Sequence, residues 1–245
     1  MKKLILTTAA LAVSATMAFA ESHGKTVRMG TEGAYPPYNF INDAGEVDGF
    51  ERELGDELCK RAKLTCEWVK NDWDSIIPNL VSGNYDTIIA GMSITDERDK
   101  VIDFTQNYIP PAASSYVALA DGVDVKTAVI AAQTGTIQAG YVAESGATLV
   151  EFATPEETIA AVRNGEADAV FADKDYLVPI VEESGGDLKF VAADVQLGGG
   201  VGMGLRESDA ELRKKFDTAI AEMKADGTLN AMIKKWFGED ATVYE

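Results

Sequence analysis

The stretch Tyr85–Thr105 concentrates groups that could bind an anion. An apolar run typical of a buried parallel strand leads into a Gly-Met-Ser turn, and Thr95 then predicts the N-cap of a helix. Arg98 falls in the first turn of that helix, where the helix dipole favours anions. A strand end, hydroxyl groups, helix N–H groups and a guanidinium together predict a site for a carboxylate or a phosphate. A simpler interpretation stays open, in which Arg98 is solvated and pairs with Asp96 or Asp99.

The elements around this stretch alternate between strand and helix patterns, which predicts an α/β fold with parallel sheets covered by helices. The expected strands are 26–31, 65–69, 88–90, 115–120, 128–132, 167–172, 188–191 and 201–205. The expected helices are 50–62, 71–80, one from 95, one from 136, 154–165, one ending at 183, 208–224 and one ending near 236. Capping boxes are predicted at Thr154 with Glu157 and at Ser208 with Glu211.

An internal echo suggests two lobes of similar build. Residues 82–91 and 164–173 share a glycine at a helix end, an aspartate three positions later and an apolar strand. Ligands in such sheets bind outside the carboxyl ends of the strands, so Gly91, Ser93 and Asp173 are placed there. Pro110–Ala113 and Gly198–Gly200 are the expected crossings between lobes. We therefore expect lobe 1 at 21–110, lobe 2 at 111–197 and a return to lobe 1 at 198–245.

Residues 1–20 have the composition of a removable signal peptide. Lys2 and Lys3 precede an apolar segment, and Ala18-Phe19-Ala20 fits a cleavage site. We therefore expect an exported, periplasmic protein. Loss of the two lysines takes the net charge from −18 to −20, which argues against a nucleic-acid partner and against anionic membranes.

Cys59 and Cys66 are the two cysteines of the sequence. In an oxidising compartment a pair this close is most simply a disulfide, here between a helix end and the next strand. A metal site needs more ligands than these cysteines and the single His23 supply. We predict neither a metal nor another cofactor.

Six segments of the chain together carry a resemblance to a known family. They are TEGAYPPYNF (31–40), GFERELGDELCKRA (49–62), WDSIIPNL (73–80), AGMSITDERDKVIDFT (90–105), NGEADAVFAD (164–173) and GMGLRESDAELRKKFDTAIAEMKADGT (202–228). They resemble the polar amino-acid binding proteins of bacterial ABC importers, solute-binding protein family 3, and most of all the lysine/arginine/ornithine-, histidine- and opine-binding type. The likeness covers nearly the whole chain after residue 20. It implies two Rossmann-like lobes joined by two crossing segments, the periplasmic binding protein type II fold.

The resemblance implies how the backbone end of an amino acid would be held. Arg98 would clamp the α-carboxylate, with further hydrogen bonds from Ser93 and from the backbone of Gly91. Thr136 would reach the carboxylate from lobe 2, through its hydroxyl and its backbone N–H. Asp173 would take the α-ammonium, although its position also fits a helix N-cap.

The resemblance also implies how the ligand side chain would be held. Tyr35 and Trp73 would sandwich it, and Glu32 matches a position that carries an acid when the ligand is cationic. Without the resemblance, Trp73 reads equally well as a core residue and Glu32 as a solvated loop acid.

The sequence departs from the basic amino-acid binders at several positions. Ala90 and Gly91 replace two serines, Ile137 replaces a usual threonine, and the segment 122–130 is shorter. These changes bear on side-chain specificity more than on the zwitterion clamp. We expect a free basic or guanidino amino acid such as arginine.

The expected function is thus that of a monomeric binding protein that delivers an amino acid to a membrane permease. The rival is a periplasmic cyclohexadienyl or arogenate dehydratase on the same fold, in which Asp173 or Glu32 would act as a general acid. Another alternative is an amino-acid binder coupled to a membrane sensor. No nucleophile motif or zinc spacing supports an enzyme.

Overall fold

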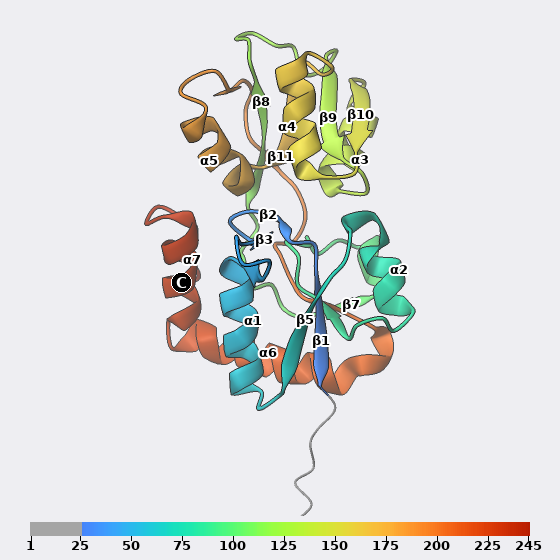
Figure 1. Ribbon diagram of the computed structural model, residues 1–245, viewed down its shortest axis with the longest axis vertical. Coiled ribbons are helices and arrows are strands. Elements are labelled where there is room, and N and C mark those ends of the chain that lie inside the picture. Colours follow the sequence, from blue (N-terminus) through green and yellow to red (C-terminus); the bar gives the residue numbers. More distant parts are fainter. Residues whose placement is uncertain (1–25) are drawn as a thin grey trace, which may run out of the picture.

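The structure is a computed structural model that describes residues 26–245. The predicted signal peptide at 1–20 and His23 lie outside these residues. Two α/β lobes stand one above the other in Figure 1, each built on its own sheet, and two segments of chain run between them. The predicted fold class is confirmed.

The sheet of lobe 1 is mixed, and its strands have the order β5-β1-β6-β14-β7. The strand β1 lies between β5 and β6 and runs parallel to both, whereas β14 runs antiparallel to β6 and β7. These strands are β1 (Val27–Thr31), β5 (Cys66–Lys70), β6 (Thr87–Ile88), β7 (Asp103–Phe104) and β14 (Gly204–Leu205). The strand β14 comes from the C-terminal part of the chain, so the chain returns to the sheet in which it began.

The sheet of lobe 2 has the order β10-β9-β11-β8-β12, with β13 also paired to β8. As in lobe 1, the first parallel strand lies between the next two, and the third pairs antiparallel on its other side. Its strands are β8 (Ala113–Ala118), β9 (Val129–Gln133), β10 (Thr148–Phe152), β11 (Ala169–Asp173), β12 (Lys189–Phe190) and β13 (Val195–Gln196).

Helices cover both sheets. In lobe 1, helices α1, α6 and α7 share one hydrophobic cluster with Met29 of β1, and α2 shares another with Ile88 of β6, so both faces are buried. The helices are α1 (Phe50–Arg61), α2 (Ile76–Val81), α3 (Ile137–Ser145), α4 (Pro155–Asn164), α5 (Lys174–Glu183), α6 (Ala210–Ala225) and α7 (Thr228–Phe237).

A small antiparallel sheet that the sequence did not predict follows β1. It consists of β2 (Ala34–Tyr35), β3 (Asn39–Ile41) and β4 (Val47–Asp48). These strands have only two or three residues each, too few for an alternation pattern to be visible. They hold the segment that carries Glu32 and Tyr35 above the sheet.

The internal echo marks the same junction in both lobes. The carboxylate of Asp86 accepts a hydrogen bond from the backbone N–H of Arg28 in β1, at 3.0 Å. The carboxylate of Asp168 accepts the corresponding bond from Val129 in β9, at 2.8 Å. The aspartate that follows each helix-ending glycine therefore ties its loop to the first parallel strand of its sheet, β1 or β9.

The capping box at Thr154 and Glu157 is confirmed, since each side chain bonds to the other residue's backbone N–H. The second capping box is wrong. The helix α6 has Asp209 at its N-cap, and the hydroxyl of Ser208 bonds to the side chain of Asp209 instead of to a helix N–H. A short 3₁₀ turn at Glu207–Asp209 precedes α6 and displaces the cap.

The predicted helix from Thr95 is also wrong. The chain forms a 3₁₀ turn at Arg98–Lys100, in which the hydroxyl of Thr95 accepts the N–H of Arg98 at 3.1 Å. Ser93 is held in an antiparallel bridge to Val201 and β7 begins at Asp103, so too few residues remain between these two anchors for a longer helix. The anion site predicted here therefore has no α-helix dipole behind it.

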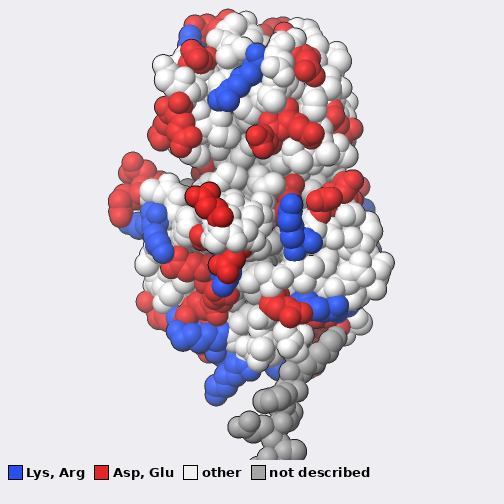
Figure 2. All heavy atoms as spheres, in the orientation of Figure 1, with Lys and Arg blue, Asp and Glu red and all other residues white. Residues whose placement is uncertain are grey.

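A disulfide joins Cys59 in α1 to Cys66 at the start of β5, as predicted. Within residues 26–245 no helix is long and apolar enough to cross a membrane. Acidic side chains are spread over both lobes on the face shown in Figure 2, with lysines and arginines between them.

Candidate functional site

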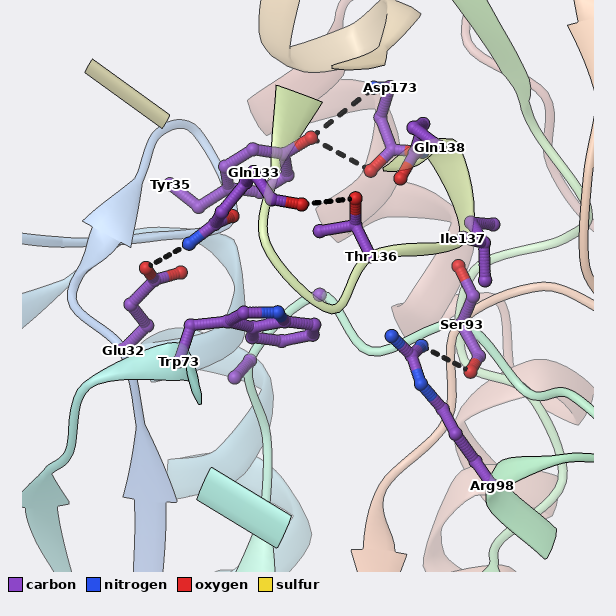
Figure 3. Close-up of a pocket in the computed structure, with 12 residues that line it drawn as sticks. Glu32, Tyr35, Trp73, Ser93, Arg98, Gln133, Thr136, Ile137, Gln138 and Asp173 are labelled. Atoms are coloured by element: carbon purple, nitrogen blue, oxygen red, sulfur yellow. Dashed lines mark hydrogen bonds between the residues drawn. The ribbon is translucent and has the colours of Figure 1, made fainter. Parts of the chain in front are cut away.

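A pocket lies between the lobes, and its lining includes every residue predicted to bind a ligand. Figure 3 shows side chains from both lobes converging on it. Their role in binding stays a prediction, because the geometry fixes only where they lie. The lining residues are Glu32, Tyr35, Trp73, Ala90, Gly91, Ser93 and Arg98 from lobe 1, and Gln133, Thr136, Ile137, Gln138 and Asp173 from lobe 2.

The Arg98 guanidinium is held by two backbone carbonyls, one from each lobe. Its terminal nitrogens donate to the oxygen of Ser93 at 2.9 Å and to the oxygen of Gly135 at 3.1 Å. Each terminal nitrogen carries two N–H groups, so one on each is left for a carboxylate. Burial lowers the pKa of Arg98 to about 10, which leaves the group cationic at neutral pH. The solvated interpretation, with Asp96 or Asp99 as partner, is not what the structure shows.

Two aromatic rings form walls of the pocket. The guanidinium carbon of Arg98 lies 5.3 Å from the centroid of the Trp73 ring, within the range of a cation–π contact. Trp73 is only partly buried and packs at the margin of a lobe-1 core cluster, so it is both a packing residue and a pocket wall. Tyr35 is buried and stacks on Tyr176 of lobe 2, with ring centroids 4.4 Å apart.

Asp173 points into the pocket and does not cap α5 with its side chain. One carboxylate oxygen accepts the amide of Gln138 at 2.8 Å, and the other accepts the hydroxyl of Tyr35 at 2.8 Å. Burial raises the pKa of Asp173 to about 6, although the bonds from Tyr35 and Gln138 oppose the rise. Asp173 is thus the N-cap residue of α5, as its position predicted, but its side chain makes no capping hydrogen bond and the carboxylate is available to a cation.

Glu32 is buried, with 5% of its surface exposed, so the solvated-loop interpretation is wrong. Its carboxylate accepts the side-chain amide of Gln133, across the cleft, at 2.6 Å. Burial raises its pKa from an ordinary 4.5 to about 7. In Figure 3, Glu32 and Arg98 lie on opposite sides of the Trp73 ring, so the acid and the guanidinium mark different ends of the pocket.

Two of the predicted hydrogen-bond donors are engaged within the protein. Thr136 is the N-cap of α3: its hydroxyl accepts the N–H of Ala139 at 3.1 Å and donates to the oxygen of Gln133 at 2.7 Å. The N–H of Gly91 donates to the carboxylate of Glu51 at 2.6 Å. With this N–H engaged, the backbone group of Gly91 that remains for a ligand is its carbonyl, an acceptor that suits an ammonium group and not a carboxylate.

Sequence reasoning missed Gln133 and Gln138 as pocket residues. Gln133 ends β9, and the rule that ligands bind at the carboxyl ends of strands could have identified it. Gln138 lies in the first turn of α3, and its amide also donates to Ser114 at 2.9 Å, a contact that no local pattern encodes. Ala90 and Ile137, noted as departures, give the pocket apolar surface where relatives of the basic-binding type would have hydroxyls.

Comparisons with known proteins agree with this geometry. The sequence profile of the bacterial extracellular solute-binding proteins, family 3, matches residues 27–239. The chain is 32% identical to the lysine/arginine/ornithine-binding periplasmic protein of Escherichia coli K12, over 100% of this chain and 99% of that protein. The chain belongs to the family 3 solute-binding proteins.

Two solved structures are similar. One is a periplasmic His/Glu/Gln/Arg/opine family-binding protein from Silicibacter pomeroyi in complex with lysine. It is 87% identical, with a TM-score of 0.88, and the match covers 89% of this chain and 100% of that one. The other is an ancestral amino-acid-binding protein described as a precursor of cyclohexadienyl dehydratase. It is 29% identical, with a TM-score of 0.79, over 86% of this chain and 95% of that one. The fold thus also lies close to an enzyme lineage.

Proposed function

We propose that this protein binds a free basic amino acid in the pocket between its lobes and presents it to a membrane permease. The observation that carries the proposal is the separation of charge in the pocket, with the cation Arg98 at one end, the acid Glu32 at the other and Asp173 facing the space between lobes. This pattern complements a zwitterion with a cationic side chain.

The backbone end of the ligand would lie against Arg98 and Asp173. The free N–H groups of Arg98 suit the two oxygens of a carboxylate. A guanidinium can bond to both oxygens at once, whereas the ammonium group of a lysine could not pair in this bidentate way. The Asp173 carboxylate and the Gly91 carbonyl are acceptors for the α-ammonium. Ser93 and Thr136 border the same region, and the hydroxyl of Thr136 would have to exchange a bond within the α3 cap to reach the ligand.

The side chain of the ligand would extend past Trp73 toward Glu32. An apolar stem would lie on the rings of Trp73 and Tyr35, and the terminal cation would meet the Glu32 carboxylate. The pKa of about 7 means that Glu32 gives up a proton readily when a cation arrives. Similarity to a protein solved in complex with lysine supports a basic ligand.

Closure would occur by bending at the two crossings, with lobe 1 at 21–110 and 198–245 and lobe 2 at 111–197. Bonds between lobes, such as Tyr35 to Asp173 and Glu32 to Gln133, already join the walls. A ligand that contacts both walls adds to them and favours the closed arrangement. We propose a periplasmic location after removal of residues 1–20, a monomeric state, and delivery to the permease of an ABC importer; a sensor-coupled role uses the same site.

A second candidate is a dehydratase, and one observation favours it. Two pocket carboxyls, Glu32 and Asp173, have pKa values raised by burial to about 7 and about 6, as a general acid requires. Both acids also have a direct use in binding a diamino ligand, so the binding function explains more of the pocket.

A thermal-shift screen tests the proposal. The protein is unfolded and refolded to remove carried-over ligand, then melted with each amino acid, ornithine, citrulline and opines. Ligand that binds the folded state raises Tm, and lysine or arginine should raise it most. The Arg98→Ala variant should lose the shift, whereas Arg52→Ala should keep it, because Arg52 is a partly exposed arginine that pairs with Asp56 and does not line the pocket. No shift with any amino acid, together with turnover of prephenate or arogenate, would establish the enzyme instead.

A further inference from the structure

Glu51 is a fully buried carboxyl group that lies behind the lobe-1 wall of the pocket. It sits in the first turn of α1 and has 0% of its surface exposed. It is not among the residues that line the pocket. Burial raises the pKa of Glu51, and hydrogen bonds from Tyr108, Gly91 and Asn39 act against the rise. Burying a carboxyl group costs free energy, so its hydrogen bonds must offset that cost, and we ask what these bonds hold in place.

The bonds of Glu51 connect two separate segments of the pocket wall. Its Oε1 accepts the N–H of Gly91 at 2.6 Å and the hydroxyl of Tyr108. Its Oε2 accepts the side-chain amide of Asn39 at 2.6 Å, and the Oδ1 of Asn39 accepts the N–H of Gly33 at 2.7 Å. Gly91 is itself a pocket residue, and Gly33 follows the pocket residue Glu32. One carboxyl thus holds the backbone on both sides of the lobe-1 wall.

We infer that Glu51 is a positioning residue of the binding site, which sets the separation between the Gly91 carbonyl and the Glu32–Tyr35 segment. A carboxylate accepts hydrogen bonds on both oxygens, whereas an amide of the same shape has a donor on one side. Gly91 has φ of +61°, a conformation that side chains rarely adopt, and its missing Cβ would lie 3.4 Å from the Tyr35 ring. The wall therefore depends on a bond to the backbone of Gly91 and cannot be fixed by a side chain there.

The same carboxyl reaches the chain that leads to lobe 2. Tyr108 is fully buried, and its N–H donates to the oxygen of Val201 at 2.7 Å. Val201 lies on the returning segment, and Tyr108 lies two residues before Pro110. Through Tyr108, Glu51 therefore connects the lobe-1 wall of the pocket to the two chain segments that lead to the crossings.

The inference rests on the proposed function, and the test begins with Glu51→Gln. Its Oε1 can still accept from Gly91 and Tyr108, but its amide then faces the amide of Asn39, donor against donor. The affinity of refolded protein for lysine or arginine, measured by calorimetry, should fall at least tenfold. The N–H of Gly33, which bonds to the displaced Asn39 side chain, should lose protection in amide exchange, a readout that needs no ligand.

A swap of the two polar groups provides the rescue. In the double variant Glu51→Gln with Asn39→Asp, the amide of the new glutamine donates to one carboxylate oxygen and Gly33 donates to the other. The net charge and the bonds from Gly33, Gly91 and Tyr108 are retained, and only the bond between positions 39 and 51 reverses its direction. Affinity should therefore return to within threefold of wild type. The matched control Glu53→Gln alters a first-turn acid of the same helix that bonds instead to Lys235 and Trp236, and it should bind as wild type does.

The outcomes separate the two proposals. If wild type binds no amino acid, the proposed function fails, whereas loss of Gly33 protection in Glu51→Gln and its return in the swap still establish the positioning network. If Glu51→Gln lowers Tm but binds lysine with wild-type affinity, Glu51 is only structural and the inference is wrong. If the single variant does not fold, a folded swap that binds supports the inference, and a swap that does not bind or fold overturns it.

Discussion

The loop before the third parallel strand is tied down in the same way in both lobes, but its surroundings differ. Asp86 accepts a hydrogen bond from a backbone N–H of β1, and Asp168 accepts the corresponding bond from β9. Asp86 is buried and also pairs with Arg28 and Arg206, at 3.0 and 3.1 Å, whereas Asp168 is exposed. Burial alone would raise the pKa of Asp86, but the two arginines hold it well below its usual range.

The opposite ends of the same strands differ in chemistry instead of in burial. In lobe 1, Ala90 and Gly91 follow the end of β6, and their small size leaves room for Tyr35 and exposes backbone to the pocket. The same lobe adds the cation Arg98 to the pocket wall. In lobe 2 the strand β11 ends at Asp173, whose carboxylate accepts the side-chain amide of Gln138. One topology used twice therefore gives a lobe-1 wall of aromatic, cationic and backbone groups and a lobe-2 wall of hydrogen-bonding groups, and a zwitterion needs both.

The largest expected effect is loss of the lobe-1 cation. Arg98→Ala should weaken amino-acid binding about 1,000-fold, roughly 4 kcal/mol, because the ligand carboxylate would lose a bidentate partner in a buried site. Isothermal calorimetry on refolded protein measures this, with Arg52→Ala as the control. Unchanged affinity would show that the ligand carboxylate binds to lobe 2 and not to Arg98 of lobe 1, which contradicts the roles assigned to the two walls.

The next effect compares the two aspartates. Asp86→Asn should lower the free energy of unfolding by about 3 kcal/mol, because two arginines would lose their buried partner. Asp168→Asn should lower it by about 0.5 kcal/mol, since an exposed amide can keep the bond to Val129. Urea denaturation of both variants gives the two values. Equal losses would show that the backbone bond, common to both lobes, is what matters.

The disulfide belongs to lobe 1, and the sequence has no cysteines left for one in lobe 2. Replacing both Cys59 and Cys66 with alanine should lower stability by about 2.5 kcal/mol, the chain-entropy value for so small a loop. The ligand affinity should stay the same, because the bridge lies away from the pocket. Denaturation and calorimetry on one preparation test both statements, and a tenfold loss of affinity would contradict the second.

The smallest expected effect is a pH dependence at Glu32. A cationic ligand needs the ionised carboxylate, so with a pKa of about 7 lysine affinity should rise about fourfold from pH 6.5 to 8.0. Asp173, with a pKa of about 6, is already mostly ionised over this range. Calorimetry at several pH values should give a flat profile for Glu32→Gln. A rise that persists in this variant would assign the titration to another group.

The stability of the ligand-free protein should change in the opposite direction. Glu32 binds its proton more tightly in the folded protein than in the unfolded chain, where its pKa is near the ordinary 4.5. Its contribution to stability is therefore present below pH 4.5 and is lost as the pH rises through about 7. Melting of wild type and Glu32→Gln across this range would reveal the difference.

Much of the fold could be predicted from local sequence. The Thr154 cap and the glycine that ends α4 are short-range signals, and both were found where they were expected. The helix expected at 71–80 begins only at Ile76, after a 3₁₀ turn at Trp73–Ser75. The echo at Asp86 and Asp168 also predicted the shared topology. The 3₁₀ turn at Arg98 could not be predicted, because it results from anchors at Ser93 and Asp103 that are set by partner strands distant in sequence.

The residues that line the pocket could be predicted better than the hydrogen bonds between them. The resemblance located residues such as Arg98 and Trp73, but the contact of Glu32 with Gln133 spans 101 positions and that of Tyr35 with Asp173 spans 138. Such pairs depend on how the lobes meet, and local patterns contain no information on that. The bond from the Gly91 N–H to Glu51 lies within lobe 1 and spans 40 positions, so it depends on how α1 packs there and no local pattern reveals it.

The pairing of both cysteines has a practical consequence for the design of an optical reporter. A third cysteine would be the one free thiol of the molecule, so a dye could be attached at a single position without protecting groups. Val101 is a suitable position, since it is 53% exposed and borders a groove whose other side includes Tyr141 of lobe 2. A fluorophore there would sense the approach of the second lobe and convert amino-acid concentration into emitted light.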